Sequence, residues 1–240
     1  LLSVGSKAAA FAVFLRVFIV AFPSLQAHWS GFLWLLCAAT MVFGSVVAIS
    51  QKNVIRMLAY SSIAHAGVIM MGLIVYNAKA VSAAMYYLLV YTFMNMGAFT
   101  VAAVYMKGAG GGELISDYKG LSSRNPLLAL LMALFLLSLA GIPPTGGFVA
   151  KFFILASAVQ AGYYWLAVIA VISTVISLFF YARVIFCMFM KEGAGDLERT
   201  RSGAPSMAAL AFSAFATMFL GLYPQPFIDL AAAALKNLFA

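Results

Sequence analysis

The stretch GIPPTGGFVAKFF, residues 141–153, interrupts a long apolar segment of this 240-residue chain. Its two prolines remove backbone hydrogen-bond donors and clash with the preceding helical turn. Its three glycines permit backbone angles that other residues resist. We therefore predict a helix break at this point, formed by Gly141, Pro143, Pro144, Gly146 and Gly147.

The apolar segment around this stretch, residues 126–161, is too long for one straight membrane helix. About 35 residues at about 1.5 Å per residue would span far more than a bilayer core of about 30 Å. The backbone groups that the break frees cannot face lipid, so they must be buried in protein or line a wet cavity. A proline kink that only shapes the helix is the simpler interpretation, and the charge that follows argues against it.

That charge is Lys151, which lies in the first turns of the second half-helix. A positive charge is electrostatically misplaced at the N-terminal end of a helix, and burial adds to the effect. We expect such an amine to take up and release a proton near working pH. Broken helices near the membrane midplane are a common feature of ion-coupled transporters.

The composition is that of a membrane protein, because 65% of the residues are hydrophobic and only 8% are charged. Apolar runs of about 20 residues or more mark membrane-spanning helices. We predict an all-α polytopic membrane protein with about seven transmembrane helices, one of them broken. The predicted segments are approximately 1–22, 31–50, 54–76, 81–106, 126–161, 163–190 and 205–223.

Two parts of the chain can be distinguished. We expect residues 1–223 to form one membrane domain that is truncated at its N-terminus, because the opening LLSVGSKAAAF reads as if it began inside a helix. Residues 224–240 form a short C-terminal tail of about the right length for an interfacial helix.

The formal charge of +8 reflects membrane topology rather than nucleic-acid binding, because the basic residues cluster in the connections between apolar segments. One side carries only Lys79 and Lys236. The other side carries Lys52, Arg56, Lys107, Lys119, Arg124, Lys191, Arg199 and Arg201. Cytoplasmic loops hold the excess of Lys and Arg, so we expect this side, and the start of the chain, to be cytoplasmic, and the C-terminus to lie on the opposite side.

Lys7 lies inside the first apolar segment, about 22 Å from its outer end at about 1.5 Å per residue. Charged residues within membrane spans are rare and commonly functional. Two interpretations stay open: a proton site, or a lysine that extends to the nearer, cytoplasmic surface. Arg16, near the outer end, is interpreted as an interfacial anchor.

His65 lies near the middle of the third segment, in AYSSIAHAG. Ser61 and Ser62 share its helix face at i−4 and i−3. Two interpretations again stay open: a histidine that is hydrogen-bonded between packed helices, or a proton relay, since histidine titrates near neutral pH.

Redox and metal motifs are absent from the sequence. It has no glycine-rich nucleotide loop, no paired cysteines and no histidine pair spaced for haem or metal. Its two cysteines, Cys37 and Cys187, lie far apart in apolar segments and suggest neither a disulfide framework nor a metal site. We therefore expect a chain that moves ions or solutes, or supports a partner.

Three stretches together carry a family resemblance: SKAAAFAVFLRVF, QKNVIRMLAYSSIAHAG and LSLAGIPPTGGFVAKFFILASAVQAG. With them the chain resembles the antiporter-like, proton-translocating membrane subunits of respiratory complex I, the bacterial NADH-quinone oxidoreductase, and among these the subunit N type. The resemblance implies helices eight to fourteen of a fourteen-helix fold with inverted repeats. It also implies an inner (plasma) membrane location.

The resemblance assigns roles to three residues. Lys7 corresponds to the central lysine of helix eight, Lys151 to the lysine of the broken helix twelve, and His65 to a polar position on helix ten. Together they imply a proton relay driven by quinone reduction in other subunits. The other membrane subunits of the complex are the implied partners, and NAD, FMN, iron–sulfur clusters and quinone are expected in partner subunits rather than in this chain. The family's glutamate on helix five and lysine on helix seven are not in this sequence.

Related complexes share much of this pattern and supply the alternatives. They are the sister subunits M and L, the cation/proton antiporters and the membrane-bound hydrogenases. A glutamate in place of Lys151 would favour subunit M, and a long lateral helix after the last span would favour subunit L; neither is present. A structural membrane scaffold without an ion path is a third possibility.

Overall fold

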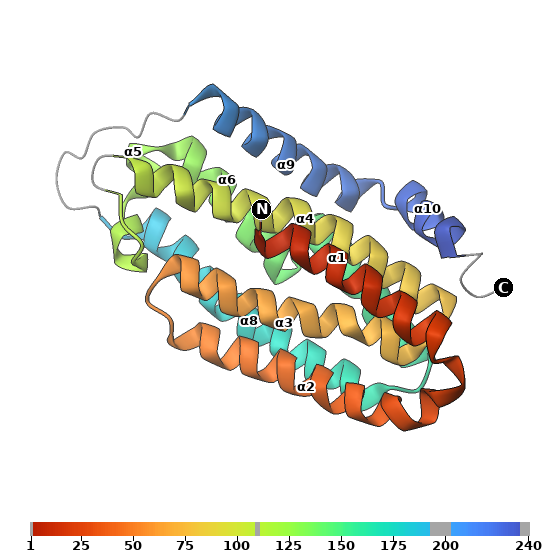
Figure 1. Ribbon diagram of the computed structural model, residues 1–240. Coiled ribbons are helices and arrows are strands. Elements are labelled where there is room, and N and C mark those ends of the chain that lie inside the picture. The colour runs from red at the N-terminus through yellow and green to blue at the C-terminus, as the bar shows by residue number, and fades with distance from the viewer. Residues whose placement is uncertain (1, 109–110, 193–202, 236–240) are drawn as a thin grey trace.

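The structure, a computed structural model, describes residues 2–108, 111–192 and 203–235. Within these ranges the chain is almost entirely helical, and its long helices run side by side along one axis of an elongated bundle (Figure 1). The predicted all-α fold of a multi-pass membrane protein is confirmed.

Five helical segments of the described residues are long and apolar enough to cross a membrane. They are α2 (Gln26–Ser50, with the 3-10 turn η2, Pro23–Leu25, before it), α3 (Val54–Val75), α4 (Ala78–Lys107), α8 (Tyr164–Met190) and α9 (Ala204–Leu222). The other two predicted segments contain shorter helices. They are α1 (Leu2–Arg16) with the π-helical turn η1 (Val17–Ala21), and the pair α6 (Pro126–Ala140) and α7 (Gly146–Gln160).

Three short elements complete the described chain. The 3-10 turn η3 (Ile115–Tyr118) and the single turn α5 (Leu121–Arg124) lie between α4 and α6, and α10 (Gln225–Leu235) follows α9. The predicted helix in the C-terminal tail is therefore present. It packs against α4, at the end of the bundle opposite the α4–α6 connection (Figure 1).

Asparagine caps begin two of the central helices. The side chain of Asn53 accepts a hydrogen bond from the backbone of Arg56 at the start of α3, and that of Asn77 accepts one from Ala80 at the start of α4. Each satisfies one of the backbone donors that a helix N-terminus leaves free. Tyr76, with φ of 52°, ends α3 in the left-handed region, so the chain reverses within two residues.

Helix α3 lies at the centre of the bundle, in contact with α2, α4, α7 and α8. It has the largest buried share of the five candidate spans. Its pairing with α2 is very close at Gly44, where a Cβ atom would lie 2.5 Å from the backbone nitrogen of Ala64. Small residues that permit such backbone approach are typical of helix packing in membranes.

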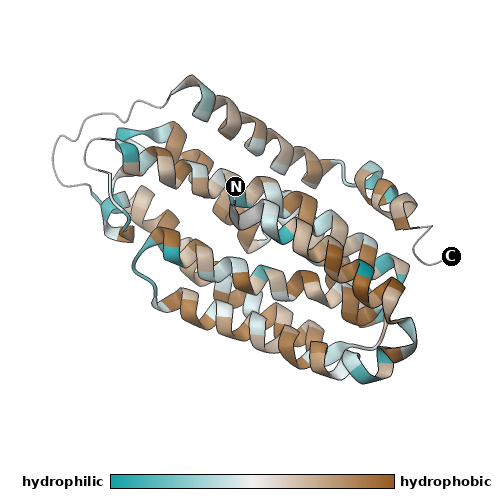
Figure 2. Cartoon of the chain, in the orientation of Figure 1, coloured by the Kyte–Doolittle hydropathy of each residue, from teal (hydrophilic) through white to brown (hydrophobic). Residues whose placement is uncertain are grey.

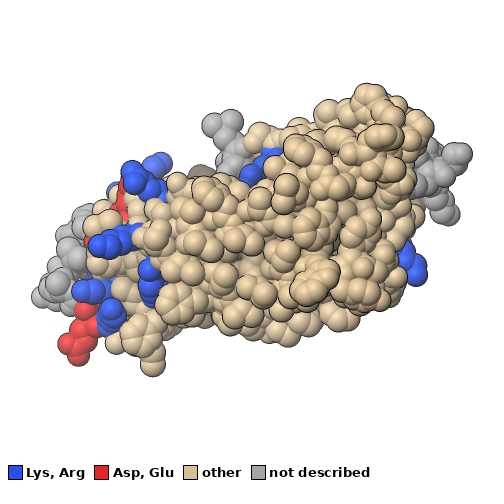
Figure 3. Space-filling view, turned by 90° about the horizontal axis from the view of Figure 1, so that it is seen from below, with Lys and Arg blue, Asp and Glu red and all other residues tan. Residues whose placement is uncertain are grey.

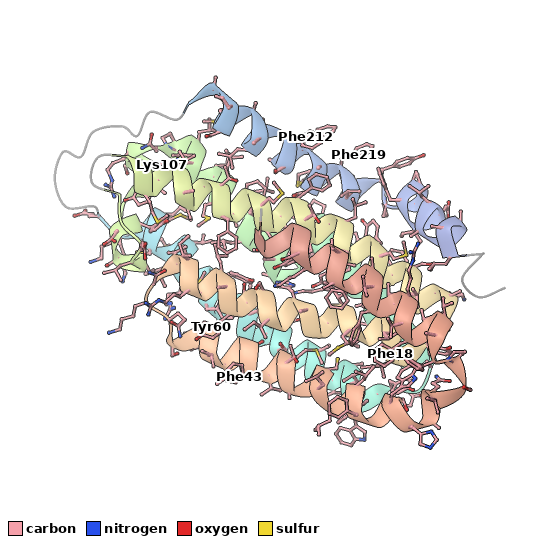
Figure 4. All side chains as sticks on the ribbon, viewed as in Figure 1. Phe18, Phe43, Tyr60, Lys107, Phe212 and Phe219 are labelled. Carbon is pink, nitrogen blue, oxygen red and sulfur yellow. The ribbon has the colours of Figure 1, made fainter. Side chains whose placement is uncertain are left out.

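The outer helices present apolar side chains to their surroundings. Phe43 on α2 and Phe212 on α9 are both exposed, at 57% and 63%, and point away from the bundle (Figure 4). Hydrophobic residues extend along the length of the helices, while hydrophilic residues gather in the connections (Figure 2). Such a surface suits lipid or neighbouring membrane subunits rather than water.

Charged side chains gather at one end of the molecule, and the broad middle of the visible face carries almost none (Figure 3). This is the end where α2 turns into α3 and where α4 connects to α6 (Figure 1). The predicted topology rests on basic residues that lie in the connections and not in the apolar helices. In the folded molecule many of these connections lie at the same end of the bundle.

Candidate functional site

The stretch that interrupts the apolar segment connects two helices of equal length. Helix α6 ends at Ala140, and Gly141 follows with φ of 85°, a left-handed conformation that glycine adopts without steric cost. The backbone N–H groups of Ile142 and Gly141 bond back to the carbonyls of Leu137 and Ser138, both at 3.0 Å, which is the Schellman arrangement. The Pro143–Pro144 bond is cis, and α7 starts at Gly146.

The first turn of α7 packs directly on the last turn of α6. The backbone N–H of Gly147 donates to the Ser138 hydroxyl at 3.2 Å. A Cβ atom at position 147 would collide with the Ser138 carbonyl oxygen. The glycine in this position therefore permits the contact that brings the two helices together.

Lys151 points back from α7 toward the end of α6. Its side chain is only 6% exposed, and its Nζ donates to the carbonyl oxygens of Leu139 and Ala140 at 2.9 and 3.1 Å. The sequence argument placed this charge only at the positive end of α7. In the structure the ammonium also lies at the negative, C-terminal end of α6, where a cation is favoured.

A small cavity adjoins Lys151. It has a volume of about 180 Å³ and lies between α7 and α8, where Gly141, Phe152 and Thr174 also line it. The Lys151 side chain therefore borders open space as well as the carbonyl groups that it binds.

His65 lies in the centre of α3, 3% exposed, and both of its ring nitrogens have partners. Nδ1 is 2.8 Å from the hydroxyl of Tyr87 on α4, and Nε2 is 3.3 Å from the hydroxyl of Tyr181 on α8. Ser61 and Ser62, which share the helix face of His65, are not its partners. Their hydroxyls donate to carbonyls of their own helix. The histidine thus joins three helices through tyrosine hydroxyls.

Lys7 points into the bundle rather than along α1 to the surface. Its Nζ donates to the Ser62 carbonyl oxygen at 2.8 Å and lies 5.5 Å from the centre of the Tyr91 ring. The Tyr91 hydroxyl is buried beside the Ser62 side chain. Lys7, half-buried, therefore shares one polar region with the serine-bearing face of α3.

The three residues singled out in the sequence lie close together. The ammonium groups of both Lys7 and Lys151 are near enough to interact electrostatically with the His65 ring. Residues separated by more than 50 positions in the sequence thus share one buried electrostatic environment.

The tyrosines of this site were not recognised in the sequence. No role was assigned to Tyr87 or Tyr181 from the sequence, yet their hydroxyls hold His65. A signal was available, since a tyrosine hydroxyl in the middle of an apolar helix needs a hydrogen-bond partner.

Two arginines of the apolar segments, Arg16 and Arg183, differ in their surroundings. Arg16 is exposed at the end of α1, as expected of an anchor. Arg183 is half-buried and binds the carbonyls of Ile49 and Gln51 at the end of α2. Among the described residues no group of three or more His, Cys, Asp or Glu side chains could hold a metal ion.

The fold and the buried polar cluster define a multi-pass α-helical membrane protein with ionisable groups in its interior. The family model described as "NADH:quinone oxidoreductase/Mrp antiporter, TM" matches residues 1–177, so the chain belongs to this family. The resemblance stated from the sequence is confirmed.

Two relatives illustrate the similarity. NADH-quinone oxidoreductase subunit N of Trichlorobacter lovleyi is 44% identical over 235 residues, which are 98% of this chain and 48% of that protein. The F(420)H(2) dehydrogenase subunit N of Methanosarcina mazei is 43% identical over 242 residues, 98% of this chain and 49% of that protein. Both are named subunit N, as predicted, and the chain spans about half the length of the curated relatives it matches.

Solved structures share the fold. A chain of respiratory complex I from Thermus thermophilus with bound NADH gives a TM-score of 0.82 at 25% identity, covering 94% of this chain and 49% of that one. A chain of the Mrp complex from Dietzia sp. gives 0.88 at 22% identity, covering 97% and 51%.

Proposed function

We propose that this chain forms part of a proton-translocating membrane subunit of an NADH-quinone oxidoreductase, of the subunit N type. In this proposal Lys7, His65 and Lys151 take up and release protons in turn. The geometry that carries the proposal is that Lys7 binds the Ser62 carbonyl about one turn from His65 on α3, and that Lys151 is buried on α7, which packs against α3, so that the charges of both lysines act on His65.

The mechanism follows from that coupling. A proton on either lysine changes the proton affinity of His65 through the Coulomb interaction, so the three groups titrate as one set. The hydroxyls of Tyr87 and Tyr181 hold the ring nitrogens of His65 and can each donate or accept a hydrogen bond. The buried hydroxyl of Tyr91 lies beside Ser62, close to the lysine that binds the Ser62 carbonyl, and adds a further polar group to this part of the bundle.

We propose that the helix pair α6–α7 is one discontinuous membrane span, and that α1 with η1 belongs to another. These two and the five long helices make seven spans, and residues 1–223 form one membrane domain. Non-helical backbone within a membrane must be buried in protein or line a cavity. Thr145 and Gly146 are buried and Gly141 lines the cavity, while the exposed Pro143 and Pro144 would be covered by a neighbouring subunit. The charged end of the bundle faces the cytoplasm and α10 lies on the periplasmic side of the inner membrane.

Quinone reduction elsewhere drives the relay in this proposal. NAD, FMN, iron–sulfur clusters and quinone belong to partner subunits, and the exposed apolar faces of the outer helices contact lipid and neighbouring membrane subunits.

The test replaces Lys151 with alanine in the intact assembly. Two rates are measured in membrane vesicles, NADH-driven quinone reduction and proton uptake, after the amount of assembled complex has been determined. We expect normal assembly with a fall in both coupled rates. Wild-type rates for both would show that Lys151 carries no proton.

Lys107→Ala is the matched control. Lys107 is exposed at the end of α4, in the charged region of the molecule (Figure 4). Its replacement removes the same charge from the same chain without touching the buried cluster. We expect both rates to stay at the wild-type level in this variant.

A subunit of a cation/proton antiporter, or of a membrane-bound hydrogenase, is the alternative. The antiporter stays an alternative because the description of the matching family names both the oxidoreductase and the Mrp antiporter. Proton movement that depends on Na⁺ and proceeds without an electron donor would favour the antiporter, whereas transport that requires NADH would favour the oxidoreductase.

A further inference from the structure

A second pocket lies far from the buried lysines, at the charged end of the bundle. It has a volume of about 380 Å³. The α2–α3 turn, the segment around η3 and the end of α8 surround it. The side chains that matter for its chemistry are Lys52, Leu114, Lys119, Arg183, Phe186 and Lys191.

The pocket is strongly basic. Four of its lining residues are lysines or arginines and none is acidic. Within the part of the chain described by the structure, no acidic side chain forms an ion pair with any of the four. Arg183 bonds to two backbone carbonyls, and its Nε is buried without a partner among the described residues.

Two acidic residues of the segment around η3 make local hydrogen bonds. Asp117 accepts hydrogen bonds from the backbone of Leu114 and the hydroxyl of Ser116, and Glu113 accepts one from Asn53. These bonds order the segment around η3 and leave each carboxylate its negative charge, but the four cations that line the pocket outnumber these two carboxylates. The pocket therefore keeps a local excess of positive charge.

Backbone hydrogen bonds hold the walls of the pocket in place. Val54 N–H donates to the Glu113 carbonyl and Ile115 N–H donates to the Lys52 carbonyl, each at 2.8 Å. These two bonds fasten the segment before η3 to the α2–α3 turn. The Cys187 thiol of α8 donates to the Ile115 carbonyl at 3.0 Å and fixes the third wall.

One wall of the pocket is apolar and continues onto the outer surface. Phe186 and Leu114 are about half exposed, and Lys191 Nζ lies 5.9 Å from the centre of the Phe186 ring. Phe189 and Met190, the next exposed residues of α8, extend the apolar surface beyond the pocket. Helices α2 and α8 end, and α3 begins, at this level of the molecule. The pocket thus lies where the headgroups of a bilayer meet its acyl chains.

We propose that this pocket binds an anionic phospholipid, with the headgroup phosphate among the four cations and an acyl chain along Phe186 and the exposed end of α8. Basic pockets between membrane helices at the surface of a bilayer are suited to such headgroups. A free anion would use the cations but not the apolar wall, which is why the lipid fits better than inorganic phosphate. The site is independent of the proton relay.

The test uses the intact membrane assembly, purified in detergent and delipidated, and fluorescently labelled phosphatidylglycerol. The variant carries Lys52→Gln, Lys119→Gln and Lys191→Gln together; Arg183 is kept because it caps α2. Each lysine near an anionic headgroup contributes about fivefold in affinity, so we expect binding about 100-fold weaker. The control carries Arg16→Gln, Arg56→Gln and Lys107→Gln, three exposed cations outside the pocket.

Support requires that wild-type protein prefers phosphatidylglycerol over phosphatidylcholine and that the control binds as the wild type does. A pocket variant that binds normally, or a control that is weakened equally, overturns the proposal. Displacement of the lipid by excess inorganic phosphate would identify a free-anion site instead. If the triple variant assembles poorly, Lys191→Gln alone is expected to weaken binding about fivefold, and an unchanged affinity would refute the site.

Discussion

The ammonium of Lys151 binds the carbonyl oxygen of Leu139 at 2.9 Å, although the two residues belong to different helices. Lys151 is therefore both the candidate proton carrier of α7 and the group that satisfies the backbone at the end of α6. These two roles can be separated by choosing substitutions that keep one and remove the other.

Lys151→Arg should keep the structure and abolish proton uptake. An arginine retains a cation with several donors for the α6 carbonyls, and the adjoining cavity gives it room, but it does not lose its proton in proteins. Lys151→Met, in contrast, should also lower stability by about 1–3 kcal/mol, because two carbonyl groups lose a charged donor. Thermal denaturation of the assembly and proton uptake in vesicles measure the two effects. An arginine variant with wild-type proton uptake would contradict this separation of roles.

Tyr87→Phe should disturb His65 more than Tyr181→Phe does. The Tyr87 hydroxyl lies 0.5 Å closer to its ring nitrogen, at 2.8 against 3.3 Å. Loss of one hydrogen bond is worth about 1 kcal/mol, so we expect proton uptake about fivefold slower. Nitrogen NMR of labelled His65 should show the Nδ1 resonance shift in Tyr87→Phe. Tyr60→Phe, on the same helix and not bonded to His65, should leave both readouts unchanged (Figure 4).

Gly147→Ala should destabilise the α6–α7 contact. The added methyl group meets the Ser138 carbonyl oxygen, which is backbone and cannot rotate away. Overpacking of this kind costs about 1–3 kcal/mol. Gly31→Ala is the matched control, since no atom lies within 4 Å of the added methyl group, and alanine should favour helix α2 slightly. The temperature at which the assembly denatures distinguishes them; equal values for both variants would refute the packing argument.

Arg183→Gln should lower the stability of the delipidated assembly by about 1–3 kcal/mol, because the Ile49 and Gln51 carbonyls lose a charged donor. Arg16 is exposed, so Arg16→Gln should change stability by less than about 0.5 kcal/mol. Denaturation of the two variants side by side checks the difference. An Arg183→Gln variant as stable as the wild type would show that the end of α2 does not depend on Arg183.

Much of the fold could be predicted from the sequence because membrane helices leave a strong local signal. The apolar segments, the break between Gly141 and Gly147 and the buried lysines are visible as runs of hydrophobic residues and as exceptions within them. The pattern is local, so it does not depend on which helices are neighbours.

The partners of the site residues could not be predicted in the same way. A histidine that is hydrogen-bonded between packed helices was one of the two interpretations of His65, but its partners, Tyr87 and Tyr181 from two other helices, could not be named from the sequence. Which helices meet at a given residue is set by packing across the whole bundle. Likewise, the charge of Lys151 was judged from α7 alone, and the end of α6 changed that judgement.

In the proposed relay, the bonds from Lys151 to the last carbonyls of α6 would make the proton on Lys151 a conformational ligand. A protonated amine complements the negative end of that helix, and a neutral amine does so less well. By reciprocity, an event that pulls the end of α6 away from α7 would favour release of the proton, and release would in turn loosen the joint between the two helices. A conformational change elsewhere in a complex that moves the end of α6 away from α7 would therefore promote proton release from Lys151. No chemical change at the lysine itself would be needed.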